Sequence, residues 1–177
     1  MKISTRPIQE TDIPLLVDYW LTADSEYLKA MGADINRIPP REDWLSMLNE
    51  QIRTPLTQKK SYCIIWLLDD QPVGHSNASD IIFGKEAHMH LHLWTPEIRK
   101  KGLGTELMKL SIPYFFNDLQ ITELYCEPYA LNQAPNRLLQ KLGFTFVKNY
   151  ITVPGWLNFE QPVNMWKLKL DEFKKMV

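Results

Sequence analysis

The sequence is poor in cysteine and has no long apolar run. Two cysteines in 177 residues are too few for the disulfide framework of a small secreted domain. Cys63 and Cys126 stand in apolar runs, so we expect two buried free thiols. Because no stretch of eighteen apolar residues occurs, no membrane span is predicted. The segment Met1–Arg6 lacks the apolar core of a signal peptide, and a cytoplasmic location is therefore expected.

The chain also lacks an excess of charge of one sign, internal repeats and Gly/Ser-rich linkers. Its 20 Lys and Arg residues balance 21 Asp and Glu residues to a net charge of −1. Such a balance gives no electrostatic reason to expect nucleic acid as a partner, although residues 99–101 form a local basic patch. With 45% apolar residues, the composition suits a packed core. We expect one domain over residues 1–177.

The hydrophobic pattern predicts alternating strands and helices. Strands are expected over residues 2–8, 61–68, 73–83, 87–94, 121–126, 144–153 and 163–170. Helices are expected from a cap at Thr11 or Asp12 past Trp20, and over residues 41–53, 104–117 and 134–142; residues 24–40 are expected to form a loop with one helical turn. A run of hairpins followed by a strand–helix–strand crossover predicts a mixed α/β sheet with helices on both faces.

The most informative motif is Arg99-Lys100-Lys101-Gly102-Leu103-Gly104, which lies between a predicted strand and a predicted helix. Glycines let the backbone come close to a ligand. A helix start offers unpaired N–H groups and a partial positive charge, which suit a diphosphate. The alternative interpretation is a glycine-rich turn with solvated lysines.

In context this segment resembles the R-x-x-G-x-G acyl-CoA signature of the GNAT superfamily. A second segment, Asn132 to Phe144, resembles the N-x-x-[AS]-x7-G-F pattern of the same superfamily, with Pro135 where relatives usually carry Ala or Ser. The two segments stand in the expected order and at the usual separation. The resemblance covers residues 60–150 well, whereas the N-terminal third matches only in its helical character. The general style is similar to the branch that acetylates ribosomal proteins.

The resemblance implies an α/β (α+β) fold with a mixed, mostly antiparallel central sheet, flanked by helices, whose fourth and fifth strands splay apart. It implies acetyl-CoA as co-substrate. Backbone N–H groups would hold its diphosphate, from the residues Lys101, Gly102, Leu103, Gly104 and Thr105. Arg99 would lie beside the diphosphate, the backbone of Leu93 and Trp94 would pair with the pantetheine arm, and Asn132 would bind the pantetheine or thiol end.

Three of the four histidines lie on one predicted strand at alternate positions: His88, His90 and His92. Period two places them on one face of that strand. Acyl transfer to an amine requires a neutral amine, and histidine is a suitable base near pH 7. The string Ala87-His88-Met89-His90 resembles the A-H-x-H of arylalkylamine N-acetyltransferases, which implies that His88 and His90 act as bases. The alternative is a row of buried histidines without a catalytic role. No metal site is expected, because no nearby carboxylate or Cys completes a ligand set.

Many relatives use a Tyr seven residues after the Asn to protonate the leaving thiolate, and this chain has Leu139 there. Tyr125, Tyr129 or Cys126 could substitute. The resemblance also implies that a backbone N–H near Trp94 meets the oxyanion.

The acceptor is expected to be an amine of a small molecule or a peptide, and the protein a monomer or homodimer. Candidate residues for the acceptor pocket are Trp20, Tyr27, Met31, Trp44, Trp156 and Phe159. Glu26 and Asp24 could attract a cationic amine, although solvated loop acids are the favoured interpretation. Two other functions stay open at this point: a non-catalytic acyl-CoA-binding domain, and a transferase for a longer acyl group.

Overall fold

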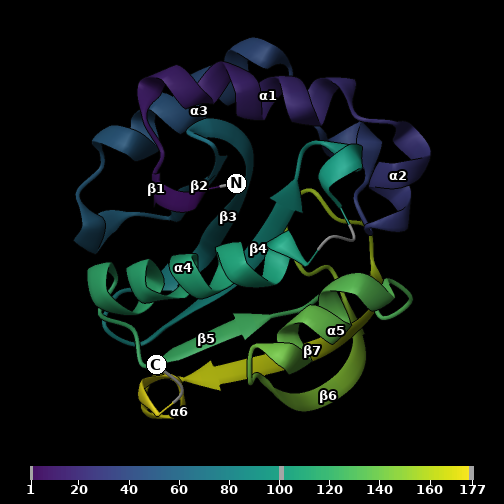
Figure 1. Ribbon diagram of the computed structural model, residues 1–177. Coiled ribbons are helices and arrows are strands. Elements are labelled where there is room, and N and C mark those ends of the chain that lie inside the picture. The colour runs from purple at the N-terminus through teal and green to yellow at the C-terminus, as the bar shows by residue number, and fades with distance from the viewer. Residues whose placement is uncertain (1, 100–101, 176–177) are drawn as a thin grey trace.

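A seven-stranded sheet forms the centre of the computed structural model, which describes residues 2–99 and 102–175 (Figure 1). The strands are β1 (Ile3–Pro7), β2 (Ser61–Leu68), β3 (Gln71–Ile82), β4 (Glu86–Leu93), β5 (Glu123–Cys126), β6 (Thr145–Thr152) and β7 (Gln161–Lys169). They lie in the order β1-β2-β3-β4-β5-β7-β6. Only the β4–β5 pair is parallel among the described strand pairs. The prediction of a mixed, mostly antiparallel sheet is confirmed.

Helices connect the strands, as the pattern predicted, with some differences in detail. They are α1 (Ile13–Thr22), α2 (Ser25–Ala30), α3 (Arg41–Arg53), α4 (Leu103–Asp118), α5 (Gln133–Lys141) and α6 (Leu170–Lys174), with short 3-10 turns η1 (Glu10–Asp12), η2 (Ile35–Arg37), η3 (Leu56–Gln58) and η4 (Pro96–Ile98). The α2 helix lies inside the segment expected as a loop, and α6 was not expected. Asp12 precedes α1 but its side chain makes no capping bond. Its carboxylate instead accepts hydrogen bonds from the Arg6 guanidinium and the N–H of Gln9.

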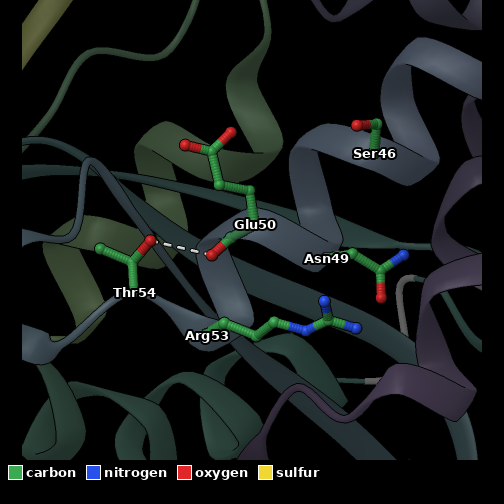
Figure 2. A pocket seen from close by; sticks show the side chains of 5 residues that line it. All are labelled: Ser46, Asn49, Glu50, Arg53 and Thr54. Atoms are coloured by element: carbon green, nitrogen blue, oxygen red, sulfur yellow. Dashed lines mark hydrogen bonds between the residues drawn. The ribbon is translucent and has the colours of Figure 1, made fainter.

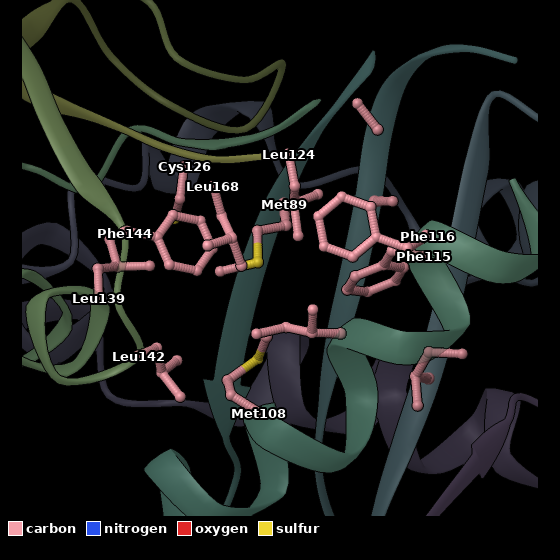
Figure 3. Close-up of a cluster of buried hydrophobic side chains, with 14 of the residues drawn as sticks. Met89, Met108, Phe115, Phe116, Leu124, Cys126, Leu139, Leu142, Phe144 and Leu168 are labelled. Atoms are coloured by element: carbon pink, nitrogen blue, oxygen red, sulfur yellow. The ribbon is translucent and has the colours of Figure 1, made fainter. Parts of the chain in front are cut away.

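Helices cover both faces of the sheet, and β2 shows this most directly. Its side chains alternate between two cores because successive residues of a strand point to opposite faces. Tyr62, Ile64 and Trp66 belong to the core under α4 and α5, whereas residues 63, 65 and 67 face α1 and α3. Figure 3 shows the first core, in which Met108 and Phe115 of α4 lie against Met89 of β4. The expectation of helices on both faces is confirmed.

Strands β4 and β5 pair only over their first residues. The parallel register joins Glu86 to Glu123, Ala87 to Leu124 and His88 to Tyr125. The β4 strand then continues to Leu93 while β5 ends at Cys126. The two strands therefore diverge after His88, which agrees with the expected splay of the fourth and fifth strands.

Candidate active site

The histidine row follows β4 from the fork between β4 and β5 toward α1. His88 belongs to the last residue pair that β4 forms with β5, whereas His92 contacts the rings of Tyr19 and Trp20 in α1. The neighbouring residues Ala87 and Met89 are fully buried on the opposite face. The three histidines thus share one face of the strand, as period two predicted.

A buried carboxylate lies against His88. Oε2 of Glu127 is 3.5 Å from Nδ1 of His88, and the two side chains are 6% and 24% exposed, respectively. The hydroxyl of Tyr150, from β6, donates to the other carboxylate oxygen of Glu127. The ring of Tyr125 stacks on the His88 ring with centroids 5.3 Å apart. Three strands therefore fix the position of one imidazole.

This arrangement favours the charged form of both partners, because it raises the pKa of His88 and lowers that of Glu127. The contact with Glu127 raises the pKa of His88 above its usual value, against the opposing effect of burial. Burial would raise the pKa of Glu127, but the interactions with His88 and Tyr150 outweigh it, and the net pKa is lowered. Glu127 is therefore ionised near neutral pH.

His90 lies in a different environment. Its Nε2 is 3.2 Å from Oγ of Ser79 on β3. The loop between β6 and β7 covers the ring closely, since a Cβ added to Gly155 would lie 3.4 Å from Cε1 of His90. Burial and the neighbouring His88 lower the pKa of His90, so this ring stays neutral near pH 7.

His92 ends the row inside an aromatic cluster rather than in an open site. Its Nδ1 is 3.3 Å from the Tyr19 hydroxyl, and its ring stacks on His75 with centroids 5.0 Å apart. The Trp94 indole donates to Nδ1 of His75 over 2.8 Å. Burial lowers the pKa of His92 well below its usual value and that of His75 to about 3. Both rings are neutral parts of the core between β3, β4 and α1.

The end of β4 presents backbone groups to the gap beside β5. The N–H of Trp94 donates to the Val73 carbonyl over 2.9 Å. Because hydrogen-bonding directions alternate along an antiparallel strand, the backbone groups of Leu91 and Leu93 point away from β3, toward the gap. The Arg99 guanidinium donates to the carbonyls of Leu93 and Trp94. The N–H groups that face the gap thus belong to Leu91 and Leu93, not to Trp94.

The start of α4 combines a positive φ with open space. Gly102 adopts a φ of 78° at the N-cap, and an added Cβ would meet nothing within 4 Å. Gly104 is different, because its added Cβ would lie 3.3 Å from Leu138 of α5, so this glycine permits helix packing. The N–H of Thr105 donates to the Gly102 carbonyl. The first N–H groups of the helix, on Leu103 and Gly104, have no helical partner.

Arg99 also packs against α2, with its guanidinium carbon 3.8 Å from the centroid of the Tyr27 ring. The expected contribution of Lys101 to the diphosphate site lies outside the described residues. Asn132 stands at the N-cap of α5 without a side-chain capping bond, one turn before Asn136. The Asn136 side chain ties α5 to β7 by accepting from Trp166 and Asn164.

The position at which many relatives carry the acid belongs here to the hydrophobic core. Leu139 is fully buried among the apolar residues under α5. Of the substitutes, Cys126 is buried in the same core, and burial raises its pKa to about 12. The Tyr125 hydroxyl donates to Glu123 over 2.6 Å, and burial with this bond raises its pKa. The ring of Tyr129 packs edge-on against Phe159.

The aromatic residues proposed for the acceptor side divide into core and surface. Trp20 and Trp44 are buried and stack on each other, whereas Trp156 is 53% exposed and leans on Trp44. Glu26 pairs with Lys29, and Asp24 caps α2. The two acids therefore make local contacts of the α2 helix, whereas the favoured interpretation was solvated loop acids.

A surface depression on α3 lies apart from these residues. Its lining consists of Ser46, Asn49, Glu50, Arg53 and Thr54, all from α3 and the residue that follows it (Figure 2). Within residues 2–99 and 102–175, no group of three or more His, Cys, Asp or Glu side chains is placed to hold a metal ion. No helix in the same ranges is both long and apolar enough to cross a membrane.

Glu127 is the residue that sequence reasoning missed. It directly follows the predicted strand 121–126, at the end of the strand that pairs with His88. Its position after that strand was a usable signal, because polar residues at strand ends can line a site. The sequence analysis considered nearby carboxylates only as metal ligands, and the pairing of β4 with β5 brings this one to His88.

Comparison with known proteins places the chain in a family. The model of the acetyltransferase (GNAT) domain matches residues 3–145. A search of curated proteins gave no match by sequence.

Among solved structures, the ribosomal L7/L12 alpha-N-protein acetyltransferase RimL in complex with coenzyme A is 16% identical, with a TM-score of 0.78 over 97% of this chain and 96% of that one. The aminoglycoside acetyltransferase AAC(6')-Ib with coenzyme A and kanamycin is 19% identical, with a TM-score of 0.74 over 98% of both chains. The spermidine N-acetyltransferase of Vibrio cholerae with CoA and spermine is 13% identical, with a TM-score of 0.79 over 97% of this chain and 98% of that one. The family match over most of the chain, on a sheet of this topology, shows that the protein belongs to the GNAT acetyltransferases.

Proposed function

We propose that this protein is a single-domain, cytoplasmic N-acetyltransferase that moves the acetyl group of acetyl-CoA to a primary amine, with His88 as general base. The observation that carries the proposal is the position of His88 at the fork of β4 and β5, with the ionised Glu127 against its Nδ1. Family membership supports acetyl transfer, and the similar structures named above contain coenzyme A.

The geometry suits proton removal by His88. A proton on Nδ1 directed at Glu127 leaves the lone pair of Nε2 free to accept another. Most amines are protonated at pH 7, and only the neutral amine can attack a carbonyl. The raised pKa of His88 makes it the stronger base in the row. His90, also a candidate from the A-H-x-H string, has a lowered pKa and is covered by the β6–β7 loop.

The acyl donor is proposed to lie where β4 and β5 diverge after His88. Acetyl-CoA supplies a thioester, which is an acetyl group activated for attack by the amine. Free N–H groups at the start of the 16-residue helix α4, with open space at Gly102, suit its diphosphate. Arg99 adds positive charge beside the N–H groups of Leu103 and Gly104, and the proposed role of Lys101 rests on its place in the sequence alone.

Other groups complete the binding proposal. Asn132, at the N-cap of α5, is proposed to bind the pantetheine or thiol end. The N–H of Thr105, expected at the diphosphate, donates to the Gly102 carbonyl and would have to leave it to bind there. The Leu93 backbone and the carbonyl of Trp94 remain candidates for pairing with the pantetheine arm. For this pairing, Arg99 must leave these carbonyls or share them.

The N–H groups of Leu91 and Leu93 are the donors placed to stabilise a developing oxyanion, since the N–H of Trp94 is committed to Val73. As the C–N bond forms and the C–S bond breaks, the proton lost by the amine passes to His88. From there it can reach the leaving sulfur. With this route, no other acid is required in place of the Tyr that many relatives carry at the position of Leu139.

The acceptor is a primary amine on a small molecule or a peptide. The similar proteins named above are acetyltransferases of a ribosomal protein, aminoglycosides and spermidine, and these substrates define the first panel of acceptors. Release of free coenzyme A from acetyl-CoA would be measured for each. Activity with at least one amine is expected.

The test of the base compares His88→Gln with His90→Gln. We expect kcat/KM to fall by roughly 10²- to 10⁴-fold for His88→Gln, because this is the usual contribution of a general base. The acidic limb of the pH profile should disappear in this variant and persist in His90→Gln. Wild-type rates in His88→Gln, with circular dichroism unchanged, would contradict the assignment.

A non-catalytic acyl-CoA-binding domain is the second candidate, favoured by the buried Leu139 in place of the usual Tyr. Calorimetric binding of acetyl-CoA without coenzyme A release from any amine would support it. A transferase for a longer acyl group would show faster turnover with succinyl-CoA than with acetyl-CoA.

A further inference from the structure

The β3 strand is irregular directly opposite the proposed base. Ser79 pairs with His88, and the next pair joins Ile82 to Glu86, so two residues of β3 oppose a single residue of β4. This arrangement is a β-bulge, a feature that is frequent next to active sites and can redirect a side chain. The first of the two residues, Asp80, has a φ of 47°. Positive φ is uncommon outside glycine, and aspartate and asparagine are among the residues that tolerate it best.

The bulge brings the Asp80 carboxylate to the face of the sheet that carries the histidines. With regular alternation, Asp80 would lie on the face opposite to Ser79. Ile81 takes that place instead, because it packs against the core under α4 and α5. Oγ of Ser79 lies 3.2 Å from Nε2 of His90 and 3.5 Å from Oδ2 of Asp80. The carboxylate therefore lies at the edge of the histidine face, and its charge acts on both His88 and His90.

Asp80 differs from the other carboxylates around His88 in its partners. Glu127 lies against His88 itself, and Glu86 lies 3.3 Å from the ammonium group of Lys85. Asp80 is exposed, and no ion pair joins it to a Lys or Arg in the part of the chain that the structure describes. Its negative charge is therefore available to a cationic group that comes to the base from solution.

We propose that Asp80 is a specificity-determining residue, whose carboxylate binds a second ammonium group of the acceptor while the reacting amine lies at His88. The acceptor class is then an aliphatic diamine rather than a monoamine. Side chains on neighbouring strands lie roughly 5–8 Å apart, between directly opposite and diagonal positions, so a chain of a few carbons can join the two groups. This inference rests on the proposed function and narrows its acceptor.

The exposure of Asp80 sets the size of the effect. Because an ion pair in contact with water is weak, the carboxylate should raise kcat/KM for a diamine by only about three- to fivefold. The gain should appear mainly in KM and should shrink with added salt, which screens exposed charges. A change in the basicity of His88 would alter the rates of a diamine and a monoamine alike. The ratio of their kcat/KM values therefore isolates the contact between Asp80 and the second ammonium group.

The test compares Asp80→Asn with Asp70→Asn, using coenzyme A release with diaminobutane and with butylamine. Asparagine removes the charge and tolerates a positive φ. Asp70 is the matched control, because it also has a positive φ, of 63°, but lies in the turn before β3 and pairs with Lys2. The ratio of kcat/KM for the diamine to that for the monoamine should fall about three- to fivefold in Asp80→Asn. It should keep its wild-type value in Asp70→Asn. An unchanged ratio in Asp80→Asn, with circular dichroism unchanged, would overturn the proposal.

A binding measurement separates this proposal from the proposed function. Calorimetry of each amine with protein saturated with coenzyme A requires no acetyl transfer. Tighter binding of diaminobutane than of butylamine, weakened in Asp80→Asn, would support the role of Asp80. If no amine then released coenzyme A from acetyl-CoA, the proposed function alone would fail. Equal affinity for the two amines, or no binding of the diamine, would overturn the role of Asp80 and leave the proposed function intact wherever an amine is turned over.

Discussion

Replacing Glu127 by Gln removes one charge from the site with almost no change in shape. The carboxylate is 6% exposed and lies 3.5 Å from Nδ1 of His88. A hydrogen bond to a charged group contributes about 1.5–3 kcal/mol. Because His88 is a quarter exposed and the contact is long, the lower end of this range applies. At 1.36 kcal/mol per factor of ten, kcat/KM should fall about tenfold from this loss.

The substitution also changes the pH dependence. Glu127 is the main cause that raises the pKa of His88. Without it, burial is opposed only by the charges of Asp80 and Glu86, and the pKa of His88 falls. The acidic limb of kcat/KM should therefore move to lower pH. In addition, an amide N–H directed at Nδ1 favours the tautomer that carries its proton on Nε2, which cannot accept another.

The assay is coenzyme A release from pH 5 to 9 with the best acceptor of the panel. Tyr150→Phe is the matched control, because it removes a hydrogen bond to the same carboxylate but keeps the charge. This control should retain an acidic limb close to that of the wild type. If Glu127→Gln, shown by circular dichroism to be folded, keeps both the wild-type rate and the wild-type limb, the link from Glu127 to His88 is refuted.

Two further predictions concern stability. Gly32→Ala should lower the free energy of unfolding, measured by urea titration, by about 2–4 kcal/mol, because φ is 89° and the new Cβ would lie 2.0 Å from the buried Gln161 amide oxygen. Gly84→Ala is the control: at φ 77° with nothing within 4 Å of the new Cβ, it should lower the free energy of unfolding by only about 1–2 kcal/mol. Burial lowers the pKa of three histidines in the folded state: His75, His90 and His92. Since the unfolded chain binds these protons near pH 6.5 and the folded chain does not, stability should fall as pH drops below 6.5, by up to about 1.4 kcal/mol per pH unit for each histidine. The raised pKa of His88 opposes this in part, and a midpoint in urea that does not change between pH 7.5 and 5 would contradict the assignment of neutral buried rings.

Local patterns predicted the elements well, because each depends on neighbours in the chain. The segments 41–53 and 61–68 have the bounds that the pattern predicted, and the alternation of β4 placed its histidines on one face. The α6 helix was missed because the contact at its start involves Glu172, whose carboxylate accepts from the N–H of Lys169, and Glu172 lies beyond the predicted strand. Nothing in residues 163–170 records that partner.

The geometry of the candidate site depends more on the register of the paired strands than on composition. The pairing of β3 with β4 directs the N–H of Trp94 to the Val73 carbonyl. The same pairing leaves the N–H groups of Leu91 and Leu93 facing the gap. The pattern of the strand alone cannot decide which alternate set faces which neighbour. Likewise, Gly104 looked like a glycine for ligand approach, and its added Cβ would instead meet Leu138 of a helix thirty residues later in the chain.

The three histidines of β4 show why position on a face does not fix chemistry. They are the same residue type, two residues apart, and only the resemblance of residues 87–90 to the A-H-x-H string sets His88 and His90 apart from His92. A buried carboxylate after β5 raises the pKa of His88, the loop at Gly155 closes over His90, and α1 encloses His92 in aromatic rings. Because each of these neighbours comes from a different part of the chain, the fold makes one imidazole a stronger base and keeps two neutral. The chemistry of the row therefore depends on which strand pairs with β4 and where that pairing ends.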